Sequence, residues 1–297
     1  MDGALRGFNC CCLIVCLLLG GCSSGVRIAY NHLDMLARSE LGRYVDLDPA
    51  QKAAFEAEFT TLWDWHRRTQ VPAYAADLRL MAGALEQQAP TRAASEEFLA
   101  RIDRHGETLW LRLEPVLARL LPLLSDAQAA QLLAKQRHDI EKEERQHADE
   151  TSDQRRQRFL RRTEESLDSW IGRLNDRQKT LANRSWTEAL PMLRSAGQRR
   201  HDRLTNVDRF GALLATRTAP GFAERLRQFG DEDAEENTGA PSRFDAAERQ
   251  RGRELTLEIV GALDSAQRRK LRERLLAIAE DCEVLVAHAA SEAGTGT

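Results

Sequence analysis

Two groups of side chains have residue types and spacing that could support chemistry, and the first lies between residues 138 and 147. It contains His138 and His147, each with a glutamate three residues away, at Glu141 and Glu144. Carboxylate-bridged metal sites in helical bundles use this spacing. The two histidines are nine residues apart, however, so they lie on opposite sides of one helix and cannot share an ion. We therefore predict a solvated charged face at this place, with no metal and no cofactor.

The second group is aromatic and lies near residue 65. Trp65, His66 and Arg67 are consecutive, and Tyr74 follows closely. Aromatic and arginine side chains often line binding surfaces, so these four residues form a candidate surface for a partner or a ligand. The alternative is an ordinary helix, in which neighbouring Trp63 continues an apolar stripe and belongs to the core.

Motifs for catalysis are missing from the sequence. It has no glycine-rich loop before a helix, no Gly-x-Ser-x-Gly and no His-Glu-x-x-His. The net charge of −3 also argues against nucleic acid as a partner, because a grip on phosphates needs a basic surface. We therefore predict a protein that is not an enzyme and does not bind nucleic acid.

Apolar residues recur with the helical period throughout the chain, and strand-like runs are missing. The pattern predicts an all-α fold, either a helical bundle or an elongated stack of antiparallel helices. Pro72 should break a helix or start one, and residues 126–170 are expected to form a highly charged helix that could run without a break. An exposed acidic loop is expected near 229–242, followed by a last helical hairpin over 244–263 and 265–290. Cys282 lies on an apolar stripe of the last helix and should pack as a small hydrophobe.

The first 22 residues have the composition of a targeting segment. Arg6 precedes an apolar run over residues 8–19, which is shorter than the roughly 20 residues that a membrane-spanning helix needs. The run ends in Leu19-Gly20-Gly21-Cys22, which has the form of a lipobox, so the chain resembles a bacterial lipoprotein precursor.

That resemblance implies a signal peptide over 1–21 and a helical periplasmic domain over 22–297. Leu19, Gly20 and Gly21 would be recognised by the signal peptidase, and Cys22 would be acylated, with palmitate among the acyl groups, to join the lipid bilayer. Ser23 follows the cysteine, where an aspartate would favour retention in the inner membrane. The resemblance thus implies the outer membrane, with the body facing the periplasm.

A short pattern occurs four times, each copy having a leucine, a capping residue and a glutamine three residues after the cap. The copies are Leu47-Asp48-Pro49-Ala50-Gln51, Leu124-Ser125-Asp126-Ala127-Gln128, Leu174-Asn175-Asp176-Arg177-Gln178 and Leu263-Asp264-Ser265-Ala266-Gln267. The arrangement is that of a capping box, so one interpretation is four well-capped helix starts. It is also similar to the Leu-Thr-x-x-Gln motif of small periplasmic stress chaperones, although every copy departs from that motif at the capping residue.

The start of the predicted mature chain resembles another group. Tyr30-Asn31, Asp34, the run over 42–48 and Gln51 are similar to the opening of proteobacterial lipoproteins catalogued only as a domain of unknown function. This resemblance implies an envelope location and an all-helical body, and it brings no catalytic residues.

Together these observations favour a membrane-anchored envelope lipoprotein without catalytic activity. We expect it to bind an envelope protein partner, as a scaffold or a chaperone-like protein. The alternative is a ligand-binding or enzymatic lipoprotein with its site in the segment from Trp63 to Tyr74, and it requires those side chains to converge on a concave pocket.

Overall fold

The structure is a computed structural model, and it describes residues 30, 33–86, 88–190, 196–235 and 240–294. Every regular element in these residues is a helix, which confirms the predicted all-α fold. None of the described helices carries an apolar stretch long enough to cross a bilayer. The predicted signal peptide and its recognition residues Leu19, Gly20 and Gly21 lie outside the described residues, as does Cys22.

The helices follow one another along the chain with only short connections between most of them. In chain order they are α3 (Leu33–Gly42), α4 (Pro49–Trp65), η1 (His66–Gln70), α5 (Val71–Ala84), α6 (Arg92–Leu120), η2 (Leu121–Leu123), α7 (Asp126–His147), α8 (Ser152–Ile171), α9 (Asp176–Ala189), α10 (Ala196–Ala215), α11 (Phe222–Glu235), α12 (Ala240–Gly261) and α13 (Ser265–Gly294).

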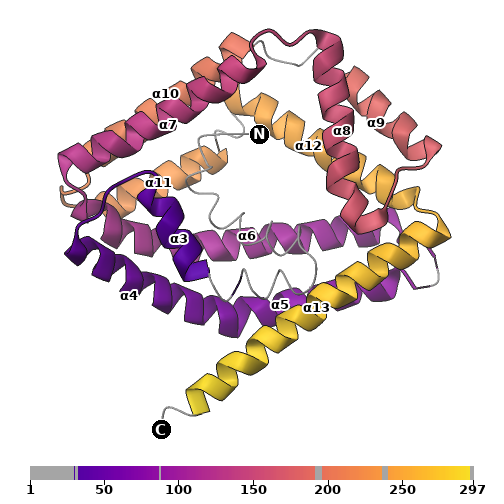
Figure 1. Cartoon of the computed structure of the whole chain (residues 1–297), viewed down its shortest axis with the longest axis horizontal. Helices are drawn as coiled ribbons and strands as arrows, with labels where there is room; N and C mark the ends of the chain where they lie inside the picture. Colours follow the sequence, from indigo (N-terminus) through magenta and orange to yellow (C-terminus); the bar gives the residue numbers. More distant parts are fainter. Residues whose placement is uncertain (1–29, 31–32, 87, 191–195, 236–239, 295–297) are drawn as a thin grey trace.

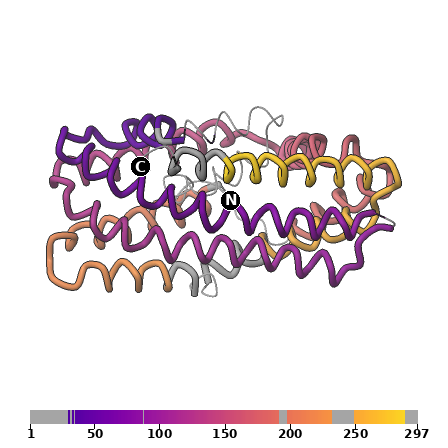
Figure 2. Tube along the Cα trace, turned by 90° about the horizontal axis from the view of Figure 1, so that it is seen from below, coloured from indigo at the N-terminus to yellow at the C-terminus, as the bar shows by residue number. Residues whose placement is uncertain are grey.

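These helices form a flat frame, with different helices along its sides (Figures 1 and 2). Helix α7 packs against α10 along one side, and α9 packs against α12 and α8 along another. Helices α4, α5, α6 and α13 run along the long lower side in Figure 1, where α5 and α13 pack against each other. The all-α class is therefore confirmed, with the helices arranged as the sides of a frame (Figure 1).

Three apolar clusters hold the frame together. One cluster, around Val45 and Leu214, joins the ends of α6, α7, α10 and α11. A second, around Leu174 and Leu263, joins α5, α8, α12 and α13. The third packs Tyr30 and Tyr74 against Cys282 in the middle of the lower side. Cys282 is fully buried, which confirms its predicted role as a small hydrophobe, and burial raises the pKa of its thiol to about 12.

Three expectations about the course of the chain need correction. The predicted acidic loop near 229–242 is wrong over most of its length, because α11 continues to Glu235 and α12 begins at Ala240, while residues 236–239 lie outside the described part. The charged segment 126–170 is two helices, because the chain turns after His147 and Thr151 caps α8. The last two helices are not a packed hairpin, since α12 contacts α9 and α6 whereas α13 contacts α5 and α8.

The chain passes Pro72 without leaving the helical course. Proline has no N–H to donate to the carbonyl four residues earlier, so an α-helix is weakened there. The five residues His66–Gln70 form a π-helix, and the N–H of Val71 donates to the carbonyl oxygen of His66. This wider turn lets α5 begin at Val71 with Pro72 in its first turn, and it turns His66 into the interior.

Candidate functional site

The predicted aromatic group lies around a buried histidine. The ring nitrogens of His66 lie 3.1 Å from the hydroxyl of Tyr30 and 3.2 Å from the hydroxyl of Tyr74. The ring of Trp63 stacks on the imidazole with a centroid distance of 5.1 Å. His66 is therefore held on three sides by aromatic side chains from α4, α5 and the segment before α3.

Burial determines the charge of this cluster. It lowers the pKa of His66 to about 4, because a buried imidazolium loses its hydration. Burial likewise raises the pKa of the Tyr30 hydroxyl well above its ordinary range. Near neutral pH the cluster is thus uncharged, and its hydrogen bonds satisfy polar atoms that would otherwise be buried without partners.

The predicted surface of Trp65, His66, Arg67 and Tyr74 is wrong for two of its members, because His66 and Tyr74 are only 1% and 9% exposed. Trp65 is half-buried, and the guanidinium of Arg112 lies 5.6 Å from its ring centroid. The guanidinium of Arg67 lies 5.7 Å from the ring centroid of Tyr30. His66 and Tyr74 thus belong to the interior, whereas Trp65 and Arg67 are half-buried at its edge.

A short polar chain leads from this interior to the surface, and no sequence pattern indicated it. The ring edge of Tyr74 meets His105 of α6, with a centroid distance of 4.7 Å. The Nε2 of His105 lies 2.8 Å from Asp77, which also accepts a hydrogen bond of 3.0 Å from Arg101. The spacing of Tyr74 and Asp77 on one helix places both on one face, but only the fold brings α6 to that face.

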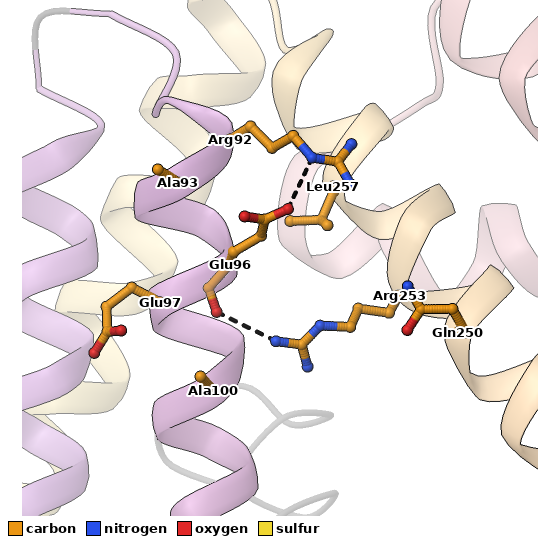
Figure 3. Close-up of a pocket in the computed structure, with 8 residues that line it drawn as sticks. All are labelled: Arg92, Ala93, Glu96, Glu97, Ala100, Gln250, Arg253 and Leu257. Carbon is orange, nitrogen blue, oxygen red and sulfur yellow. Dashed lines mark hydrogen bonds and ion pairs between the residues drawn. The ribbon is translucent and has the colours of Figure 1, made fainter.

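A hollow among the described residues lies elsewhere, between α6 and α12 (Figure 3). It has a volume of about 430 Å³, and Arg92, Glu96, Arg253 and Leu257 are among its lining residues. Arg92 pairs with Glu96 and with Glu254, and Arg253 donates to the carbonyl oxygen of Glu96. Both cations are therefore already bound to acceptors of the protein, which makes the hollow a poor site for an anionic ligand.

A second hollow, of about 400 Å³, lies where the end of α7 meets the start of α10 and includes Glu141 and Glu144. Among the described residues no three His, Cys, Asp or Glu side chains come together in a way that could hold a metal ion. His147 instead lies 3.1 Å from Glu150, three residues further along.

The four repeated motifs form the most regular feature of the structure, and they meet in two pairs. The copies that end in Gln51 and Gln128 meet at one end of the frame, where α4 and α7 begin (Figure 1). The copies that end in Gln178 and Gln267 meet at the other end, where α9 and α13 begin. We call these the first and the second junction.

In the first junction the two glutamine amides bind each other reciprocally. The amide nitrogen of Gln51 donates to Oε1 of Gln128 at 2.8 Å, and the reverse bond measures 2.7 Å. Each nitrogen also donates to a carbonyl of the partner motif, at Leu123 for Gln51 (2.7 Å) and at Asp46 for Gln128 (2.6 Å). Each of these two acceptor residues immediately precedes the leucine of its own motif.

The second junction has closely similar geometry. Gln178 and Gln267 exchange amide hydrogen bonds of 3.0 and 2.9 Å. Gln267 donates to the carbonyl of Arg173, which again precedes the motif leucine. Gln178 differs, because it donates at 3.3 Å to the carbonyl of Ile259 and at 3.5 Å to the matching carbonyl of Ala262. The reciprocal glutamine pair is thus common to both junctions, and each pair joins two helix starts.

Each of the four glutamines also takes part in the N-terminal cap of its own helix. In all four copies the side chain of the cap accepts from the N–H of the glutamine, and Oε1 of the glutamine accepts from the N–H of the cap. The predicted capping boxes are thus confirmed. The sequence did not predict the pairing, since copies 77 and 89 residues apart show no sign of their partners.

Comparison with known proteins places this architecture in a family. The model of a family of unknown function, DUF6279, matches residues 43–235, which is more than half of the chain. The chain belongs to DUF6279. This confirms the predicted membership of a domain family of unknown function. Neither the curated proteins nor the solved structures give a match.

The DUF6279 match covers the first junction completely and the second only in part. Residues 43–235 contain both halves of the first junction, Gln51 and Gln128. They also contain Gln178, but its partner Gln267 lies beyond the matched range, on the last helix of the structure. The first junction is therefore built entirely from the matched part, whereas the second needs α13 to complete it.

Proposed function

We propose that this DUF6279 protein is a lipid-anchored envelope lipoprotein that has no catalytic activity and binds a protein partner as a scaffold or chaperone-like protein. Acylated Cys22 joins it to the outer membrane, and residues 22–297 face the periplasm. The frame of clamped helices supplies a stiff support, and its lower side supplies the binding surface.

The distribution of exposed apolar side chains carries this proposal. Six of the seven large apolar side chains that are exposed among the described residues lie in the part of the chain from α3 to the turn after α6. Leu80, Ile102 and Leu111 are on α5 and α6 of the lower side, Met35 and Leu36 are on α3, and Leu123 is in the turn after α6. Single exposed apolar residues are normal, but a concentration on one part of a protein is typical of an interaction surface.

Two further observations support a binding role. The residues of the alternative site, Trp63, His66 and Tyr74, fill a core, which leaves the enzymatic hypothesis without a pocket at that place. The paired motifs resemble the Leu-Thr-x-x-Gln motif of periplasmic chaperones in residue types and spacing. Because α3 begins eleven residues after the predicted anchor, a protein bound in this way would be held near the bilayer.

The test is crosslinking in intact cells, followed by mass spectrometry of the proteins that copurify. Wild type is compared with Leu80→Ser/Ile102→Ser/Leu111→Ser and with a matched control, Leu190→Ser, which removes an exposed large apolar residue away from the lower side. We expect the triple variant to lose its partners and the control to keep them. Discrete envelope proteins would indicate a scaffold, and a broad set of unfolded clients a chaperone. Equal recovery from all three proteins would refute the proposed surface.

The anchor is tested separately by labelling with palmitate and by membrane fractionation. Wild type should incorporate the label and sediment with the outer membrane, whereas Cys22→Ala should do neither. Incorporation by Cys22→Ala would show that another residue is acylated.

A further inference from the structure

The two junctions share their geometry but not their charge. In each motif we compare the nine residues from the one before the leucine to the third after the glutamine. In the first junction these windows carry Asp46, Asp48, Asp126 and Lys52, a net charge of −2. In the second they carry Asp176 and Asp264 against six bases, a net charge of +4. The bases are Arg173, Arg177, Lys179, Arg268, Arg269 and Lys270. We call these six residues the basic corner.

The side chains of the basic corner are available to a ligand. Five are exposed, and Arg268 is half-buried. Within the described residues only Lys270 makes a side-chain hydrogen bond, to the carbonyl oxygen of Asp168, and none of the six forms an ion pair. Arginines elsewhere in the frame commonly pair with carboxylates, as Arg79 does with Glu283 and Arg119 with Glu58.

A second basic run makes this contrast clearer. Helix α8 begins with five arginines between residues 155 and 162, which could also contact an anionic surface. There, however, Arg158 pairs with Glu150 and Arg161 with Glu165, and Arg156 donates to Asn183. Three of the five arginines in this run therefore have side-chain partners, whereas five of the six bases of the corner have none among the described residues.

We propose that the basic corner binds the headgroups of anionic phospholipids and thereby fixes the orientation of the frame on the membrane. Clusters of four to eight Lys and Arg residues beside a membrane anchor bind anionic lipids, and each base near the surface strengthens binding roughly fivefold. This inference rests on the lipid anchor of the proposed function, which keeps the corner close to the bilayer.

The length of chain between the anchor and the corner permits both to reach one membrane plane. Tyr30 follows Cys22 by eight residues, and a chain of this length spans at most about 28 Å. Tyr30 packs in one cluster with Cys282, which is fifteen residues along α13 from Gln267, a helical length of about 22 Å. The chain from Cys22 to Tyr30 can thus extend as far as the helix from Cys282 to Gln267. Acylated Cys22 and the corner can therefore contact the bilayer together.

The test measures vesicle binding by the full chain with Cys22→Ala, so that acylation does not dominate. The readout is the ratio of binding to phosphatidylcholine vesicles with and without phosphatidylglycerol, which cancels any contribution of the apolar N-terminal segment. The corner variant is Arg177→Gln/Arg268→Gln/Arg269→Gln. The matched control, Arg43→Gln/Lys52→Gln/Lys142→Gln, removes three exposed bases elsewhere. We expect the corner variant to lower the ratio at least about tenfold and the control to leave it nearly unchanged.

Three results would overturn the proposal. The first is an unchanged ratio for the corner variant, whose folding is checked by its thermal unfolding. The second is an equal loss in the control, which would indicate net charge alone. The third is binding of inorganic phosphate to the corner without vesicles and with equal strength, which would indicate a site for soluble phosphate. Because this experiment uses unacylated protein and no protein partner, its outcome is independent of the tests of the proposed function.

Discussion

The two junctions of the frame use the same hydrogen bonds in different surroundings. Gln178 and Gln267 are 0% and 6% exposed, whereas Gln51 and Gln128 are half-buried. A hydrogen bond between amides contributes about 1 kcal/mol, but a buried amide left without its partner costs about 1–3 kcal/mol more. The same motif should therefore contribute little to the free energy of unfolding at the first junction and much more at the second.

The junctions also differ in what supports them. At the first, Arg217 is buried and donates to the carbonyl oxygens of Leu124 and Leu214 and to Asp126. At the second, Asn175 caps α9 and also donates to the carbonyl of Ala262 and to Gln267. The buried guanidinium of Arg217 thus supports the half-buried first junction. Side-chain amides complete the buried second junction.

The largest effect on stability should come from removing the side-chain amide of one glutamine in each junction. We expect Gln178→Ala to lower the free energy of unfolding by about 3 kcal/mol, because the amide of Gln267 and nearby carbonyls lose a buried partner. Gln128→Ala should cost only about 1 kcal/mol, since water can replace the lost bonds. Urea unfolding of both variants measures the difference, and equal losses would contradict the role given to burial.

A double variant tests whether the loss comes from the unsatisfied partner. Gln178→Leu/Gln267→Leu removes both buried amides at once, so it should be less destabilising than the sum of the two single changes. A simply additive loss would show that the two glutamines contribute independently.

Acid should weaken the middle of the lower side, whereas the side-chain amides and backbone carbonyls that pair in both junctions do not titrate in this range. The pKa of His66 is lowered to about 4 in the folded protein, against about 6.5 in an unfolded chain. The unfolded state therefore binds more protons between these values, and stability falls as the pH falls from 6.5 to 4. The loss amounts to roughly 3 kcal/mol by pH 4.

The measurement is urea unfolding at a series of pH values, with His66→Phe as the control. The variant has no imidazole at this position, so the part of the acid dependence due to His66 should disappear. If both proteins lose stability equally on acidification, His66 is not the residue responsible.

Arg217 offers a smaller test at the first junction. Arg217→Met keeps much of the side-chain volume but removes the donors to Leu124 and Leu214, so we expect a loss of about 2 kcal/mol. The bond to Asp126 contributes little, because the side chain of Asp126 is 98% exposed. Asp126→Asn is the matched control, and a loss as large as that of the Met variant would assign the effect to the ion pair.

The sequence predicted what depends on neighbours along the chain. Helical periodicity indicated the fold class, and each capping box was visible because its two partners lie three residues apart. The pairing of Gln178 with Gln267 was not visible, since it depends on how α9 and α13 meet in space. The interior position of His66 was also missed, because it depends on a π-turn before Pro72 and on Tyr30 arriving from the other side.

The smallest effect should come from a capping box that has no partner. Thr151 and Gln154 at the start of α8 form the same reciprocal cap, but Glu150 stands where the motif has leucine, and no glutamine pairs with Gln154 among the described residues. Gln154→Ala therefore removes only a local bond and should cost about 0.5 kcal/mol, less than Gln128→Ala. Both residues are the third of their helices and both changes leave the cap itself in place, so the difference in urea unfolding isolates the contribution of pairing. If Gln154→Ala costs as much as Gln128→Ala, capping alone explains the motif, and the junctions add nothing to it at the exposed end of the frame.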